Sequence, residues 1–238
     1  FFLFTSFIEP HFQNHTDDYP APTGYEESYL DCWMPPDLRA LGGSSARHLP
    51  GYYGMIKRLD EAFGRVIDAL KSLELEEKTI VVFTTDHGCH FKTRNGEYKR
   101  SCHDASMRIP MALQGPGFDG GGRLKDMINL VDLPATLMDA CNVPIPEHVQ
   151  GRSFLPLTKG QREGWREEAY AEIFDPPYLC RTVRTQRWKY AVKRVEKGLD
   201  DLSSWTFAED SLYDLRADPY ELNNLVGLRS HRQVADVM

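Results

Sequence analysis

Apolar residues recur at every third or fourth position between Tyr53 and Leu73, and charged residues fill most positions between them. This period predicts an amphipathic helix. Residues 79–85 follow as a β-branched, apolar run, which is typical of a central parallel strand covered by helices on both faces. A helix followed by a buried strand indicates an α/β fold, in which ligands bind beyond the carboxyl ends of the strands. We therefore expect the chemistry in the loop from Asp86 to Arg108.

Other segments of the first 160 residues fit the same fold class. The run Phe1–Ile8 is mostly apolar and aromatic, so it predicts a buried strand. A chain that opens inside a core strand is expected to be a fragment or a processed piece. The segment 9–49 has little periodicity and is typical of a functional loop. A second strand is expected near Ile109–Leu113, and a helix near Pro134–Cys141 with Asp132 as its N-cap.

The pattern changes near Trp165. Short stretches of alternating residues follow at 182–184, 188–192 and 211–215, and they predict a small antiparallel sheet. We therefore divide the chain into residues 1–160, which form part of the α/β domain, and residues 161–238, a small antiparallel subdomain.

The composition excludes some functions. The 238 residues carry a formal net charge of −7 and are 41% hydrophobic, as expected for a globular protein with a core. An acidic chain lacks the basic surface that sequence-independent nucleic-acid binding needs. No apolar run approaches the roughly 20 residues that span a bilayer. We therefore expect no nucleic-acid partner and no membrane span, and we leave localisation and oligomeric state open.

The cysteines do not form a recognisable framework. There are five, an odd number, and no CxxC pair is present. This pattern favours neither a set of disulfides nor a zinc ribbon. Cys89 and Cys102 flank the loop of interest, and whether they pair is left open, with reduced thiols expected.

The dipeptide Asp86-His87 follows directly after the predicted buried strand, and Gly88 allows a sharp turn there. A carboxylate and an imidazole at a strand end can ligate Ca²⁺ or Mg²⁺, and the histidine also tolerates Mn²⁺ or Zn²⁺. The alternative is that Asp86 caps a helix and His87 bonds locally. The loop that follows is cationic within an acidic chain, as an anionic substrate requires, although a solvated basic loop gives the same pattern. Its basic residues are His90, Lys92, Arg94, Lys99, Arg100, His103 and Arg108.

An ordered set of motifs resembles the type I sulfatase signature. Asp86-His87-Gly88 is followed by Lys99, then by Arg108-Ile109-Pro110 and Gly115-Pro116-Gly117. Further matches run in the same order along nearly the whole chain. They are Pro10-His11 after the first predicted strand, the stretch 131–137 (VDLPATL), Gly151-Arg152-Ser153 and the carboxyl-terminal stretch 212–225 (LYDLRADPYELNNL).

This resemblance implies the fold of the alkaline-phosphatase superfamily: a parallel sheet flanked by helices, with a small antiparallel carboxyl-terminal subdomain. It implies that Asp86 and His87 are metal ligands, normally for Ca²⁺, with Mg²⁺ possible. Lys99 would bind the sulfate and favour departure of the leaving oxygen, and His11 would contact the sulfate or protonate the bridging oxygen. Such neutralisation and protonation make a sulfate ester reactive.

Four further residues are candidates for substrate binding. Asn14 follows Pro10-His11 and could line a pocket, and His90 and Arg94 could contact sulfate or carboxylate groups of a sugar. A solvated loop explains these residues equally well. His103 is the fourth candidate, and positioning of Lys99 is its favoured role.

The resemblance implies a nucleophile that the chain lacks. The family nucleophile is a formylglycine made from Cys or Ser in a C/S-x-P-x-R motif, and none of the 238 residues belongs to such a motif. We therefore expect the nucleophile upstream of Phe1 and the isolated chain to be inactive. The predicted function is a sulfuric ester hydrolase acting on a sulfated carbohydrate or small molecule. The alternatives are a phosphodiesterase or phosphonate monoester hydrolase of the same fold, or a non-catalytic remnant.

Overall fold

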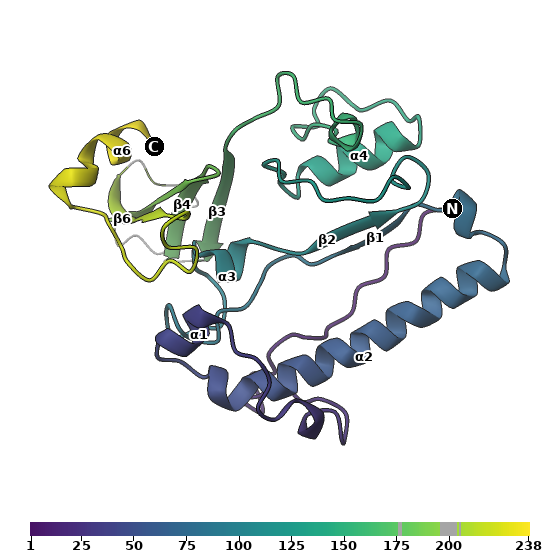
Figure 1. Ribbon diagram of the computed structural model, residues 1–238, viewed down its shortest axis with the longest axis horizontal. Helices are drawn as coiled ribbons and strands as arrows, with labels where there is room; N and C mark the ends of the chain where they lie inside the picture. The colour runs from purple at the N-terminus through teal and green to yellow at the C-terminus, as the bar shows by residue number, and fades with distance from the viewer. Residues whose placement is uncertain (176–177, 196–203, 205) are drawn as a thin grey trace. The chain divides into compact units, whose positions relative to one another are not determined.

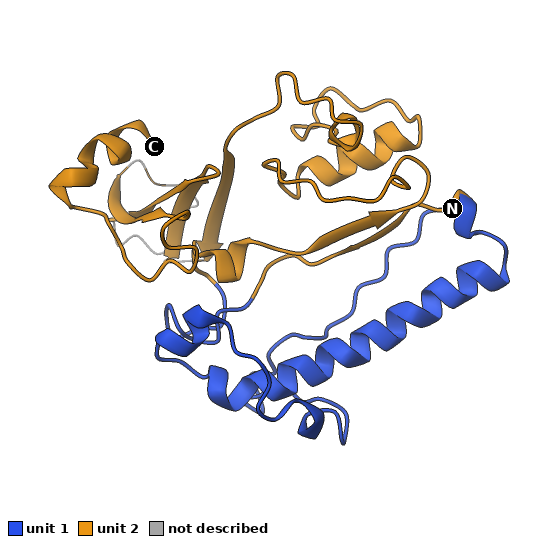
Figure 2. Ribbon diagram, in the orientation of Figure 1, with its two compact units in different colours: residues 1–77, 89–99 blue, residues 78–88, 100–238 orange. Residues whose placement is uncertain are grey.

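The computed structural model describes residues 1–175, 178–195, 204 and 206–238 (Figure 1). The chain divides into two compact units, shown in different colours in Figure 2. Unit 1 comprises residues 1–77 and 89–99, and unit 2 comprises residues 78–88 and 100–238. Each unit is therefore built from two separate stretches of the chain, and the stretches of the two units alternate. The boundary at residue 160 stays a prediction.

Unit 1 is built on the long helix α2, Ser45–Ser72, which confirms the helix predicted from the apolar period and begins earlier than expected. The short helix α1 (Pro36–Ala40) and the 3₁₀ turn η1 (Glu27–Tyr29) precede it, and the 3₁₀ turn η2 (Glu76–Lys78) follows. The amino-terminal half of α2 is buried against a largely aromatic core, because apolar side chains gather on one stripe of the helix. The buried core residues are Phe12, Tyr19, Leu38, Leu49, Met55, Phe91 and Tyr98.

Gly51 explains how α2 approaches the irregular segment before it. A Cβ atom at this position would lie 2.4 Å from the carbonyl oxygen of Tyr19, which is too close for any side chain. The glycine therefore lets backbone meet backbone, and this close approach keeps Tyr19 inside the core.

The predicted buried strand at Phe1–Ile8 is not formed. These residues have no strand conformation, and Phe1, Phe2 and Phe4 are at least 80% exposed. A continuous apolar run becomes a buried strand only when neighbouring strands supply hydrogen bonds and other elements cover both faces. No strand among the described residues pairs with this segment.

The two strands around the loop of interest belong to unit 2. Strand β1 is Val81–Thr84 and strand β2 is Met111–Gln114. Both strands were predicted, but they pair antiparallel, with Thr84 opposite Met111, and β1 is only half-buried. The expectation of a parallel, fully covered strand is therefore wrong for this pair, because the chain leaves β1 at Thr84 and returns in the opposite direction.

Helix α4, Asp132–Ala140, confirms the helix predicted in this region, but Asp132 is not its N-cap. Its fully buried carboxylate accepts hydrogen bonds from the backbone N–H groups of Asn129 and Arg152 and pairs with the guanidinium of Arg166. Burial alone would raise the pKa of Asp132, but these donors hold it below its usual value. The carboxylate thus joins three segments rather than capping one. Two shorter helices in this unit are α3 (Asp104–Met107) and α5 (Leu155–Thr158).

The carboxyl-terminal sheet is antiparallel with strand order β3-β4-β5-β6, as the alternating pattern predicted. Its strands are Ala169–Asp175, Tyr178–Arg184, Trp188–Arg194 and Phe207–Asp214, of which the first was not expected. The 3₁₀ turn η3 (Arg229–His231) and helix α6 (Arg232–Val237) follow. Among the described residues, every helix is too short or too polar to cross a membrane.

All five cysteines are free thiols. Cys102 and Cys180 are buried in unit 2 with their sulfur atoms 2.9 Å apart. Cys89, in unit 1, lies 3.0 Å from the hydroxyl of Tyr19. The pairing of Cys89 with Cys102 that the sequence left open is therefore not formed.

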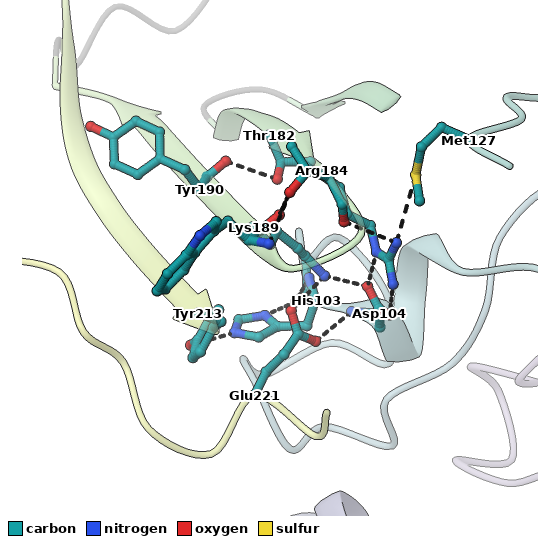
Figure 3. A network of polar contacts seen from close by, with 12 residues as sticks. His103, Asp104, Met127, Thr182, Arg184, Lys189, Tyr190, Tyr213 and Glu221 are labelled. Atoms are coloured by element: carbon teal, nitrogen blue, oxygen red, sulfur yellow. Dashed lines mark hydrogen bonds and ion pairs between the residues drawn. The ribbon is translucent and has the colours of Figure 1, made fainter. Parts of the chain in front are cut away.

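A buried ionic network joins α3 to β5 and to the carboxyl-terminal segment (Figure 3). The ammonium of Lys189 lies 2.6 Å from a carboxylate oxygen of Asp104 and 2.5 Å from one of Glu221. The backbone N–H of Asp104 donates to the other carboxylate oxygen of Glu221, and Arg184 also pairs with Asp104. Lys189 and Glu221 are each only 2% exposed. The network therefore keeps Lys189 and Glu221 away from water and pairs them with the partly buried Asp104 and Arg184.

The pKa values of the two carboxyls follow from this arrangement. Burial opposes ionisation of Asp104, but the charges of Lys189 and Arg184 outweigh it and hold its pKa below the usual value. Burial raises the pKa of Glu221, and the neighbouring carboxylate of Asp104 adds to this effect against the attraction of Lys189. Lys189 is the cation that both carboxylates share.

We expect Lys189→Met to lower the free energy of unfolding by about 3 kcal/mol or more, because two buried carboxylates would lose their shared cation. The matched control is Lys193→Met on the same strand. Its ion pair with Asp210 is largely exposed, so the expected loss is below about 1 kcal/mol. Urea unfolding of both variants measures the difference. Equal losses would contradict the role given to Lys189.

Candidate active site

Asp86 and His87 lie just beyond the carboxyl end of β1, in unit 2. One carboxylate oxygen of Asp86 accepts the backbone N–H of His87 at 2.9 Å. Gly88 then passes close to helix α3: its N–H donates to the carbonyl of Ser106, and a Cβ atom there would lie 2.2 Å from the carbonyl oxygen of Ala105. Only glycine fits at this position, so the loop leaves the strand on a path that presents Asp86 to solvent.

The geometry of His87 fits a metal ligand. Its Nδ1 lies 2.8 Å from the carbonyl oxygen of Gly88, and a carbonyl can only accept, so Nδ1 carries the hydrogen. Nε2 of the neutral ring therefore presents a lone pair, and it lies 3.5 Å from a carboxylate oxygen of Asp86. A protonated ring can pair with this carboxylate directly, and in the neutral ring the lone pair and the carboxylate can face a common cation. Donation of the second ring nitrogen to a carbonyl is the usual arrangement of a metal-bound histidine.

These two side chains offer two donor atoms that could ligate a metal ion. Within the described part of the chain, no cluster of three or more His, Cys, Asp or Glu side chains is arranged to hold a metal ion. The donor pair of one carboxylate and one imidazole suits a divalent cation, as the sequence predicted, and its oxygen ligand is the type that Ca²⁺ and Mg²⁺ prefer.

His11 and Lys99 lie in unit 1, together with Tyr98. Nδ1 of His11 lies 2.6 Å from the carbonyl oxygen of Phe12, and Nε2 lies 2.8 Å from the hydroxyl of Tyr98. The ammonium of Lys99 lies 5.2 Å from the centre of the Tyr98 ring. The structure thus places both predicted catalytic residues against one tyrosine, which the sequence analysis did not identify. In the sequence, only the position of Tyr98 next to Lys99 could have pointed to this tyrosine.

His90 does not lie where a substrate-binding residue would. Its side chain is fully buried. Its Nε2 donates to the carbonyl of Lys99 at 2.8 Å, its Nδ1 accepts from the backbone N–H of Arg94, and its own backbone N–H donates to the carbonyl of Tyr98. This position corrects the expectation of direct substrate contact, because both ring nitrogens bond the backbone. His90 instead holds the Tyr98-Lys99 segment in place.

The other candidates divide between the two units. Asn14 is exposed at the tip of a tight turn that the Gln13–Asp18 bridge closes, and Arg94 is half-buried; both belong to unit 1. His103 belongs to unit 2, where its ring nitrogens contact the hydroxyls of Ser101 and Tyr213 at 2.5 Å and 3.0 Å. These contacts engage both ring nitrogens within unit 2, and the positioning of Lys99 by His103 stays a prediction.

Two family models match this chain. The model described as sulfatase matches residues 1–143, and the model described as N-sulphoglucosamine sulphohydrolase, C-terminal, matches residues 96–238. Together with the fold and the ordered motifs, these matches show that the chain belongs to the sulfatase family.

Individual proteins agree with this assignment. Human arylsulfatase K is 31% identical over 73% of this chain and 32% of its own length. The ulvan-active sulfatase of Formosa agariphila is 29% identical over 95% of this chain and 44% of its own length. A solved structure from Bacteroides thetaiotaomicron, described in connection with the metabolism of multiple glycosaminoglycans, has a TM-score of 0.76 at 25% identity and covers 96% of this chain and 50% of that one. The predicted fold class is confirmed, and the chain spans about a third of the length of the arylsulfatase K proteins that it matches.

The buried His90 predicts a pH dependence of stability. Burial lowers its pKa from the ordinary value of 6.5, so below about pH 6.5 the unfolded chain binds a proton that the folded chain does not. The free energy of unfolding should therefore fall as the pH drops from 6.5 through the lower pKa of the folded state. In His90→Gln the amide can still donate to Lys99 but does not titrate, so this variant should lose less stability than the wild type between about pH 7.5 and pH 5.5.

Urea unfolding at the two pH values measures this difference. The control is His148→Gln at an exposed position, which should reproduce the wild-type pH dependence. An unchanged pH dependence in His90→Gln would contradict the prediction.

Proposed function

We propose that this chain is part of a sulfuric ester hydrolase that releases sulfate from a sulfated carbohydrate. Membership of the sulfatase family supports the reaction class. The substrate class is supported by the ulvan-active relative and by the structural relative associated with glycosaminoglycans. The observation that carries the proposal is the pair at the end of β1, where a carboxylate oxygen and an imidazole nitrogen lie 3.5 Å apart in the tautomer that binds a metal.

We assign the chemical roles as follows. Asp86 and His87 hold a divalent cation, Ca²⁺ in the first instance and Mg²⁺ as the alternative. A bound cation neutralises charge on the sulfate oxygens and so makes the sulfur more electrophilic. Lys99 binds the sulfate and stabilises the negative charge that develops on the leaving oxygen. His11 transfers a proton to that oxygen, and this transfer matters most when the leaving group is a sugar alkoxide.

The nucleophile is assigned to residues outside this chain. The resemblance to type I sulfatases implies a formylglycine formed within C/S-x-P-x-R, and the 238 residues contain no such motif. The isolated chain should therefore release no sulfate above background. Arg94 and Asn14 keep their proposed roles as groups that contact the sugar, whereas His90 and His103 act by holding the loop.

Lys99→Ala, made in the protein that carries the nucleophile, should lower kcat/KM for 4-nitrophenyl sulfate by about 100-fold to 1,000-fold, because the developing charge loses a fixed cation. The control Lys71→Ala removes an exposed lysine from α2 in the same unit and should leave turnover unchanged. Unaltered sulfate release in Lys99→Ala would contradict the role of Lys99. Faster wild-type turnover of bis-4-nitrophenyl phosphate than of the sulfate would favour the phosphodiesterase alternative.

Asp86→Asn should weaken Ca²⁺ binding by about tenfold or more, since it removes an anionic oxygen ligand. Isothermal titration calorimetry with Ca²⁺, and separately with Mg²⁺, measures the change and ranks the two ions. Asp119→Asn removes an exposed carboxylate elsewhere in unit 2 and serves as the control. Equal affinities in the two variants would contradict the assignment of the metal to Asp86.

A further inference from the structure

Two of the five cysteines lie side by side inside unit 2, although 78 positions separate them in the chain. Cys102 precedes helix α3 and Cys180 lies on strand β4, and both side chains are buried. Their sulfur atoms are 2.9 Å apart, which is about 0.9 Å longer than the S–S bond of a disulfide. A small movement of the two side chains would therefore bring the sulfurs to bonding distance.

The backbones that carry the two thiols are held by separate sets of contacts. Cys180 is paired on both sides, with Ile173 on β3 and with Lys193 on β5. The segment that contains Cys102 is held by the buried ionic network, which begins two residues further on (Figure 3). The fold therefore supplies the proximity that a disulfide requires, and it does so between elements that are far apart in the sequence.

One of the two thiols ionises more readily than the other. The S–H of Cys102 donates to the sulfur of Cys180 and lowers the pKa of Cys180, and this effect outweighs burial, which raises it. The ammonium of Lys193 on the neighbouring strand acts in the same direction as the hydrogen bond. A thiolate is the species that attacks a disulfide, so Cys180 is the expected nucleophile of the pair.

We propose that Cys102 and Cys180 are a disulfide-forming pair: in the presence of a low-molecular-weight disulfide such as oxidised glutathione, they close a bond that links the segment before α3 to β4. This inference is independent of the proposed function, since neither cysteine is assigned a part in the reaction with a sulfate ester.

The bond forms in two exchange steps. The thiolate of Cys180 attacks one sulfur of the oxidant, which breaks the S–S bond of the oxidant, forms a mixed disulfide and releases one thiolate. The thiolate of Cys102 then attacks the sulfur of Cys180 and releases the second. In total the two cysteines lose two electrons and two protons, and the oxidant becomes two thiols. Because both sulfurs are buried in the folded chain, the oxidant reaches them during folding or local opening.

The alternative is that the two thiols only fill space. They belong to a small apolar cluster with Ala191, and a reduced cysteine packs as a small apolar side chain. The two interpretations differ in the response to an oxidant, because thiols that only fill space would stay reduced.

The first test maps the bond in the protein that carries the nucleophile. Reduced protein is refolded in a buffer of oxidised and reduced glutathione, native protein is incubated in the same buffer, and free thiols are then alkylated. Trypsin gives peptides 101–108 and 167–181, each with one cysteine. Mass spectrometry should find these two peptides linked, in preference to any pair with another cysteine. Alkylation of both cysteines in both samples, or a predominance of other pairs, would overturn the proposal.

The second test measures the effect of the bond on stability. Closing a loop of this length restricts the unfolded chain, so Tm should be about 5 °C or more higher after treatment with oxidised glutathione than after reduction. The difference should vanish in Cys180→Ala and remain in Cys141→Ala, which removes an exposed thiol. An equal difference in both variants would assign the effect to another cysteine and overturn the proposal. Peptide mapping of the wild type decides the question even where Cys180→Ala does not fold.

Discussion

One buried cation, Lys189, joins three segments of unit 2. Lys189 lies between the carboxylates of Asp104 and Glu221, and removal of its ammonium would leave two negative charges without their shared partner away from water. Burying charges carries a large desolvation cost, which only close and complete pairing offsets. Helix α3 has four residues, too few to be stable alone, so it depends on this pairing for its position. The same network fixes the segment that follows His103, and Gly88 packs closely against α3.

In unit 1 the buried groups that need partners are backbone carbonyls of an irregular segment. A loop without regular secondary structure still has backbone carbonyls that need donors when they are buried. His90 satisfies two consecutive carbonyls, those of Tyr98 and Lys99, and burial favours the neutral imidazole, whose Nδ1 can accept from the backbone N–H of Arg94. The aromatic core then fixes the side chain of Tyr98. His90 thus has a structural role: it holds in place the segment that carries Lys99, to which we assign a chemical role. In the sequence alone, such a structural histidine looks no different from a catalytic one.

The contacts of the ring nitrogens separate these roles. In His90 and His103 both nitrogens contact protein groups that hold the loop. In His87 one nitrogen donates to a carbonyl while the other faces a carboxylate oxygen, an arrangement that a cation would stabilise. In His11 one nitrogen faces a carbonyl and the other a hydroxyl, whereas both nitrogens of His103 face hydroxyls, so a carbonyl fixes the tautomer of His11 but not that of His103. The residue type alone does not distinguish these cases.

The sequence by itself determined the features that a short window of residues encodes. The apolar period predicted α2, the alternating stretches predicted the carboxyl-terminal antiparallel sheet, and the ordered motifs identified the sulfatase family. The candidate site residues Asp86, His87, Lys99 and His11 also came from these motifs. Only the tertiary structure decided that β1 and β2 pair antiparallel, that Phe1–Ile8 is exposed, and that Asp132 joins segments instead of capping a helix. It also revealed Tyr98 beside His11 and Lys189 beside Asp104, pairs that are 87 and 85 positions apart in the chain. Strand direction, burial and charge pairing depend on which distant residues meet, and no local pattern records that.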